Sequence, residues 1–296
     1  MRTAARSRRL RDVPAALIFL GPAAVGFLTF YLWPAVRGLY LSFTDYSLLS
    51  APEFIGLENY ERLIGDHLFW NALAVTLEYV VINIAVQTVF AVLLAVLMHR
   101  LTKSLTIRSI ILLPYLIANV IAALVWYSML DYQTGVVNQL LEWLSIDRVA
   151  FFGETTTAIP TIALVNTWRH VGYTALLVFA GLQAIPKQVY EAAAIDGASE
   201  WKTFWRVTLP LLRPVMALVL VLTVIGSFQV FDTVAVTTTG GPINATRVIY
   251  YYIFEQAFAR FDFGYASALS LALFIILAGV AYAQLRLTRA SHSDLS

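Results

Sequence analysis

The sequence contains no cysteine, which excludes disulfide bonds, thiolate catalysis and cysteine-based metal sites. Charged residues are also scarce, at 13% of the chain, whereas soluble domains contain about 25%. No Gly-Lys dipeptide occurs, so the phosphate-binding loop of ATPases is missing. The His-Glu-x-x-His and Gly-x-Ser-x-Gly motifs are missing too, and the four histidines are scattered. The sequence therefore carries no motif of a soluble hydrolase, a metalloenzyme or an ATPase.

Hydrophobic residues, in contrast, make up 59% of the chain, and the mean hydropathy is +0.73. The net charge of +2 is too small to indicate a nucleic-acid partner. A membrane-spanning helix needs about 20 mostly apolar residues. The sequence predicts an all-α polytopic membrane protein with six spans, at about 14–36, 71–98, 107–130, 158–184, 210–231 and 264–286.

The first apolar segment follows five arginines between Met1 and Arg11, as in a signal peptide. The apolar stretch is of full spanning length, however, and Trp33-Pro34 lies where a small-residue cleavage site would be expected. We therefore predict a basic N-terminus at 1–13, followed by an uncleaved first span.

The positions of the basic residues predict the orientation of the spans. Of the 20 Lys and Arg residues, 14 lie in the termini and connections on one side, five lie on the other side, and Arg169 lies inside the fourth span. One transmembrane domain, 14–286, is thus predicted, with cytoplasmic termini, a tail at 287–296 and a cytoplasmic connection at 186–210. The outer connections are longer than hairpins need, which indicates an external partner or ordinary loop variation; they are 37–70, 131–157 and 232–263.

The connection 186–210 mixes charged with apolar residues and predicts two short helices. Pro186 suits a first helical turn, and the alanines at 192–194 favour a helix. Gly197 lies where a helix would end on a left-handed residue. Ser199 can then cap the second helix.

The second helix is rich in aromatic residues. It is expected to present four residues on one face, at three- and four-residue spacing: Trp201, Phe204, Trp205 and Thr208. Large apolar side chains need a surface to pack on, either the protein's own spans or a partner. Pro210 and Pro214 fit a bend into the fifth span.

This connection carries a family resemblance. The pattern Glu191-Ala-Ala, then Asp196-Gly-Ala, then an aromatic-rich helix and Leu209-Pro210 resembles the EAA loop of binding-protein-dependent ABC transporter permeases. One departure is Val207, in place of the isoleucine that the family has before Leu-Pro. Five further segments resemble the sugar branch, typified by maltose and glycerol-phosphate permeases; they are 54–60, 166–169, 180–187, 239–246 and 261–268.

The resemblance implies an ABC type I importer permease fold and a role as one of two membrane subunits of an ATP-driven importer. The implied substrate is a sugar, an oligosaccharide or a polyol phosphate. The implied partners are a homologous permease subunit, two copies of a cytoplasmic ABC ATPase that holds ATP and Mg, and an extracytoplasmic solute-binding protein, in the plasma membrane of a prokaryote. The chain itself would hold no cofactor and catalyse no reaction.

In the resembling family the EAA loop docks on the ATPase. Carried over residue by residue, the docking set is Glu191, Ala192, Ala193, Asp196 and Gly197, with Leu209 and Pro210 fixing the exit into the fifth span.

Polar residues inside spans are costly in lipid, so they indicate either function or bonds between helices. Asn, Trp and Tyr side chains suit a sugar, which is held by hydrogen bonds and an aromatic face. In the alternative, Arg169 pairs with an acidic or carbonyl partner, and Asn83 and Gln87, which share a helix face, join the spans. The candidates for the substrate path are Asn83, Gln87, Asn166, Trp168, Arg169, Tyr173, Gln229 and Asp232.

Gly240, Gly241 and Pro242 lie in the last outer connection. The two glycines are expected to give this loop conformational freedom. The resemblance implies that the loop contacts the binding protein, and the alternative is a plain turn.

Two rival functions remain open at the level of sequence. An ion-coupled secondary transporter would show internal repeats and deep acidic residues, yet Glu78 and Asp232 lie near the outer ends of their spans. An integral-membrane enzyme would need an acid–base pair or a metal cluster at one depth, and the sequence displays neither.

Overall fold

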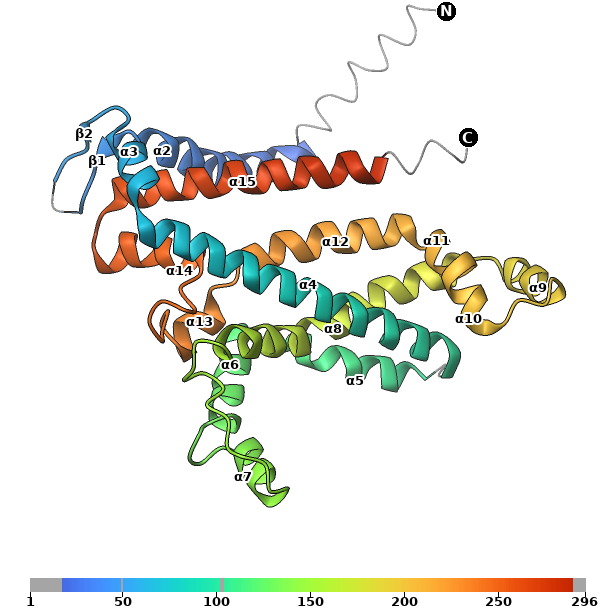
Figure 1. The fold of residues 1–296 in the computed structure, drawn as a ribbon. Coiled ribbons are helices and arrows are strands. Elements are labelled where there is room, and N and C mark those ends of the chain that lie inside the picture. Colours follow the sequence, from blue (N-terminus) through green and yellow to red (C-terminus); the bar gives the residue numbers. More distant parts are fainter. Residues whose placement is uncertain (1–17, 49, 102–103, 290–296) are drawn as a thin grey trace, which may run out of the picture. The chain divides into compact units, whose positions relative to one another are not determined.

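A computed structural model describes residues 18–48, 50–101 and 104–289 (Figure 1). These residues are helical apart from turns and one short strand pair. The chain forms two compact units. Unit 1 comprises the residues up to Gly65 together with Phe254–Phe274, and unit 2 comprises Asp66–Ile253 together with the residues from Ile275 onward.

Unit 1 begins with one long apolar helix, Ile18–Leu41. This helix contains the π-helical turn η1 (Leu28–Leu32) and ends as α2 (Trp33–Leu41). An antiparallel strand pair follows, in which Thr44 lies opposite Phe54. The buried Asn59 side chain donates to the Ser42 and Thr44 carbonyl oxygens and so ties the next helix to this pair. The remaining elements are β1 (Thr44–Asp45), β2 (Glu53–Phe54), α3 (Glu58–Gly65), η3 (Glu255–Ala259) and the first part of α15 (Phe263–Arg289).

Unit 2 is a helical bundle in which α4 (His67–Leu101) packs along α8 (Ala158–Ala184). Small side chains permit this close approach, since Ala91, Ala95 and Ala175 are all fully buried. The other elements of unit 2 are α5 (Leu105–Leu116), α6 (Asn119–Met129), α7 (Val136–Trp143), α9 (Lys187–Ile195), α10 (Glu200–Thr203), η2 (Phe204–Thr208), α11 (Leu209–Leu211), α12 (Arg213–Phe228) and α13 (Asp232–Thr237); α14 (Ile249–Phe254) ends at the boundary with unit 1. Figure 1 shows α9 and α10 at one end of this bundle and α6 and α13 at the other.

The predicted spans correspond to helices, with one correction. Among the described residues, four helices are individually long and apolar enough to cross a membrane: Ile18–Leu41, His67–Leu101, Arg213–Thr237 and Phe263–Gln284. The fourth predicted span coincides with α8, which is 27 residues long but too polar to pass the same test. A total of six spans stays a prediction.

The predicted span over 107–130 is not one straight helix. The chain turns by 91° between α5 and α6, where Ile117 and Ala118 are both extended. The turn ends the helical hydrogen bonding at Ile117, and the Nε of Arg169 donates to the freed Ile117 carbonyl oxygen at 2.7 Å. A side chain of α8 thus replaces a backbone donor at the break.

The predicted basic N-terminus, 1–13, lies outside the described residues, as do the first positions of the first span. At the other end α15 continues to Arg289, so the predicted tail 287–296 begins as helix, and residues 290–296 lie outside the described part of the chain.

Candidate functional site: a coupling segment and a polar pocket

The first part of the candidate site is the coupling segment, which we define as residues 186–212. Its helix α9 ends in a hydrogen-bond pattern in which Gly197 N–H donates to the Ala194 carbonyl at 3.1 Å and Ala198 N–H donates to the Ala193 carbonyl at 3.0 Å. Gly197 has φ = +71°, the left-handed conformation that closes this motif. The predicted role of Gly197 as a helix terminator is confirmed.

The second helix of the coupling segment begins as predicted. The Ser199 hydroxyl accepts a hydrogen bond from Lys202 N–H at 3.4 Å, so Ser199 is the N-cap of α10. Glu200, in the first turn of α10, forms an ion pair with Arg100 at the end of α4. This pair links the coupling segment to the longest helix of the bundle.

The predicted docking residues lie largely on the free surface of this segment. Glu191, Ala192 and Asp196 are exposed, whereas Ala193 is buried. Leu209 and Pro210 are half-buried within α11, which continues directly from η2. The helical conformation persists through Pro210 and is interrupted at Leu212, between the two prolines at which a bend was predicted.

The prediction of one shared face for the aromatic residues is also wrong. Trp201 is 74% exposed, and its ring contacts Trp205 edge-on, whereas Thr208 is only 5% exposed. The cause is η2, since a π-helical turn takes more residues per turn than an α-helix and so rotates Thr208 inward. Phe204 and Thr208 line a cavity of about 610 Å³, together with Tyr190 of α9 and His99 of α4.

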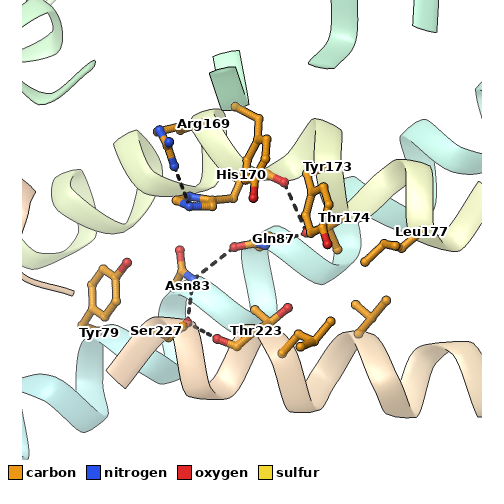
Figure 2. A pocket seen from close by; sticks show the side chains of 14 residues that line it. Tyr79, Asn83, Gln87, Arg169, His170, Tyr173, Thr174, Leu177, Thr223 and Ser227 are labelled. Atoms are coloured by element: carbon orange, nitrogen blue, oxygen red, sulfur yellow. Dashed lines mark hydrogen bonds between the residues drawn. The ribbon is translucent and has the colours of Figure 1, made fainter. Parts of the chain in front are cut away.

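The second part of the site is a polar pocket of about 190 Å³ between α4, α5, α8 and α12 (Figure 2). Asn83 lines it; its Nδ2 donates to Ser227 Oγ at 2.9 Å and its Oδ1 accepts from Thr167 at 3.2 Å. Gln87 donates to Thr174 Oγ1 at 2.8 Å. Asn83 and Gln87 thus join three helices, which agrees with the expectation that they bond the spans, and they also line the pocket.

Arg169 and His170 form the polar wall of the pocket. Arg169 Nη1 lies 2.8 Å from His170 Nε2, and His170 Nδ1 lies 2.8 Å from the Asn166 carbonyl oxygen. Because a guanidinium only donates and a carbonyl only accepts, Nε2 is the acceptor and Nδ1 carries the proton. His170 is therefore held in its neutral form. Arg169 has a carbonyl partner at Ile117, as the structural alternative predicted.

An aromatic pair completes the pocket. The rings of Tyr115 and Tyr173 stack with centroids 4.6 Å apart and an interplanar angle of 11°. The Arg169 guanidinium lies 5.3 Å from the Tyr115 ring centroid. The pocket thus presents aromatic surface, one guanidinium and several amides and hydroxyls, which is the set of groups that binds a polyhydroxylated ring.

Four of the predicted path residues lie elsewhere. Trp168 meets Trp126 edge-on and lines a separate apolar cavity of about 390 Å³. Asn166 is buried and accepts from Thr233. Asp232 accepts from Asn119, whereas Gln229 is exposed at the end of α12. The eight predicted residues therefore do not form one lining.

Sequence reasoning missed several lining residues of the pocket. A signal existed for Tyr79, which precedes Asn83 and Gln87 at four-residue spacing on the same face of α4. The same spacing relates Thr174 to His170 and Ser227 to Thr223. Tyr115 had no such signal. It lies in α5, next to Pro114, and it does not share a helix face with another lining residue.

The loop predicted to contact a binding protein is closely held. Thr246 Oγ1 lies 2.6 Å from the Gly241 carbonyl oxygen and 2.7 Å from Thr238 Oγ1, and Gly240 is buried at φ = +86°. Gly240 therefore adopts a left-handed conformation that glycine permits and other residues rarely take. Ile243, at the tip of the loop, is 90% exposed.

Comparison with known proteins identifies the family. The family described as binding-protein-dependent transport system inner membrane component matches residues 87–288. The chain belongs to this family. The permease is 34% identical over 92% of its length to the probable ABC transporter permease protein YesP of Bacillus subtilis, with 90% of that relative covered. It is 31% identical to the trehalose/maltose transport system permease protein MalF of Thermococcus litoralis, over 95% of this chain and 96% of that one.

The fold agrees with this assignment. A bacterial alginate ABC transporter, solved in complex with an alginate pentasaccharide-bound periplasmic protein, matches 97% of the permease and 98% of its own chain with a TM-score of 0.85 at 24% identity. The permease therefore has the ABC type I importer fold, and it is a transport component. The ion-coupled transporter left open by the sequence is not favoured.

Proposed function

We propose that the permease forms one half of the translocation pathway of an ATP-driven importer of sugars or oligosaccharides, with a homologous permease as the other half. The family and the trehalose/maltose relative support this substrate class. The pocket supports it independently, because Tyr115 and Tyr173 offer an aromatic face beside Arg169 and a network of amides and hydroxyls.

The observation that carries the proposal is the rigid, exposed coupling segment. Its first helix is closed by the motif at Gly197, and its second is capped at Ser199 and ion-paired to α4 through Glu200. A short helix fixed in this way transmits the displacement of a docked partner to α8 and α12, which it joins. The partner is a separate cytoplasmic ATPase, present in two copies, each with ATP and Mg.

The opposite end of the bundle receives the substrate. The tightly bonded loop with Gly240, Gly241 and Pro242 presents the exposed Ile243, which suits contact with a solute-binding protein. The excess of Lys and Arg at the coupling-segment end supports a cytoplasmic position for that end and an outer position for the loop. The family supports the plasma membrane of a prokaryote as the location.

Reconstitution tests the proposal. The permease, its partner permease and the ATPase are placed in proteoliposomes, with ATP enclosed and the binding protein loaded with a radiolabelled maltodextrin or trehalose outside. We expect uptake that requires both ATP and the binding protein and survives an uncoupler. Uptake that is abolished by an uncoupler and indifferent to ATP would contradict the proposal.

A further inference from the structure

The segment 131–150, which follows α6 in unit 2, is held together by one buried polar side chain. Asn138 is fully buried at its centre. Its Nδ2 donates to the Asp131 and Val149 carbonyl oxygens, each at 3.0 Å, and its Oδ1 accepts from Val149 N–H at 2.8 Å. The Asn138 side chain therefore joins α7 to the residues before it and to the residues after it. These bonds fix which face of α7 points outward.

Three charged side chains of the segment, those of Asp131, Glu142 and Arg148, are bonded within it, whereas Asp147 is exposed. Asp131 Oδ1 accepts from the Thr134 and Gln133 backbone N–H groups, and these bonds lower the pKa of the Asp131 carboxyl. Arg148 lies 2.6 Å from Glu142 and also donates to the Tyr132 and Gln133 carbonyl oxygens. The segment is thus a self-contained unit with a preset orientation.

The opposite side of α7 is apolar and exposed. Val136, Leu140 and Trp143 are spaced by four and three residues and lie on one face, where Leu140 is 54% and Trp143 80% exposed. Leu144 and Ile146 extend this surface. A short helix with a buried polar anchor, Asn138, on one side and an exposed apolar face on the other suits contact with an apolar surface.

The neighbouring element indicates which environment this is. The segment follows α6, which belongs to the apolar helix pair bent by 91° and exposes Ile121, Leu124 and Val125. Figure 1 shows α7 beyond the end of α6, projecting away from the main bundle of unit 2. Tryptophan is enriched where a membrane meets water, and short amphipathic helices lie in that interface.

We propose that α7 lies in the bilayer interface, with Val136, Leu140 and Trp143 inserted among the lipids and Gln133, in the preceding turn, in water. The inserted helix anchors a segment that also borders the outer loop, since Tyr132, Thr238 and Pro242 line one cavity of about 310 Å³. The lipid contact thereby restricts the movement of the surface around the candidate binding-protein loop, which contains Gly240, Gly241 and Pro242.

The lack of native cysteine allows a clean test, because one introduced cysteine is the sole labelling site of this chain once the thiols of the other subunits are blocked. Leu140→Cys and Trp143→Cys, with Gln133→Cys as the matched control, are labelled with a nitroxide in the assembled importer. The bilayers consist of phosphatidylcholine and phosphatidylglycerol. We expect oxygen to relax the labels at 140 and 143 more strongly than a water-soluble nickel chelate does, and the reverse at 133.

Three results would overturn the proposal. Stronger relaxation by nickel at 140 and 143 would place this face in water. Exclusion of both reagents would mean that protein, such as the second permease, covers it. If oxygen relaxes the labels at 140 and 143 more strongly only after the binding protein is added, the lipid contact depends on the binding protein and not on α7 itself.

A second measurement does not depend on the labelled variants. Lipids brominated near the headgroup quench tryptophan fluorescence on contact, so the quenched fraction should fall clearly in Trp143→Phe relative to the natural sequence. An unchanged quenched fraction would contradict the lipid contact of Trp143.

Discussion

The coupling segment and the polar pocket are held together in different ways. In the coupling segment the decisive bonds are local, such as Ala198 N–H to the Ala193 carbonyl and Lys202 N–H to Ser199. In the pocket they join distant parts of the chain, since Asn83 and Ser227 are 144 positions apart. A change in the segment should therefore alter coupling and leave the bundle intact, whereas a change in the pocket network should affect both stability and transport.

The largest expected effect is that of Gly197→Val. No atom lies within 4 Å of an added Cβ, so the substitution fits sterically, but the left-handed φ of +71° disfavours a β-branched residue. A penalty of about 1–2 kcal/mol shifts the motif toward other conformations. We expect ATP-dependent uptake to fall about tenfold with an unchanged melting temperature.

Gly197→Asn is the matched control, because asparagine tolerates the left-handed conformation. It should keep most of the uptake and bind the ATPase normally. Wild-type uptake in Gly197→Val would show that the closed motif is not needed for coupling.

Asn83→Leu tests the other side of the comparison. It leaves Thr167 Oγ1 and Gln87 Oε1 without their Asn83 partner inside the bundle, at a cost of about 1–3 kcal/mol. We expect a clearly lower melting temperature together with reduced transport. Val81→Leu, on an exposed part of the same helix, should change neither; a stable Asn83→Leu permease would mean that the network contributes little.

Arg169→Lys separates the charge of this side chain from its hydrogen bonds. Lysine keeps the charge but donates from one nitrogen, whereas arginine reaches the Ile117 carbonyl with Nε and His170 with Nη1. We expect a several-fold loss of uptake with a small change in melting temperature. If the Arg169→Lys permease takes up as much substrate as the natural sequence, transport requires only a positive charge at this position.

Arg100→Gln has the smallest expected effect. The pair with Glu200 is solvent-exposed, so its contribution is about 0.2–1 kcal/mol and weakens with salt. Uptake should fall less than about fivefold, and high salt should diminish the difference from the natural sequence. A loss as large as that of Gly197→Val would make the link to α4 as important as the local motif.

The sequence predictions succeeded mainly where the bonds are local, as in the coupling segment, and less where the bonds join distant parts of the chain, as in the pocket. The roles of Gly197 and Ser199 were predictable because the partners of these residues lie within a few positions. The shared face of Trp201 and Thr208 was not, since nothing in their spacing reveals a π-helical turn. The pocket was predicted only in part: Arg169 and Trp168 are adjacent in sequence, yet they line different cavities.

The sequence by itself determined the membrane class, the long helices and the closed turn at Gly197, because apolar length and local backbone bonding need no distant partner. Only the tertiary structure decided the break between α5 and α6 and the composition of the pocket. At the break, Arg169 reaches the Ile117 carbonyl across 52 positions, and at the pocket Gln87 reaches Thr174 across 87. These contacts depend on how α4, α5 and α8 are packed, and packing fixes which face of each helix meets its neighbour.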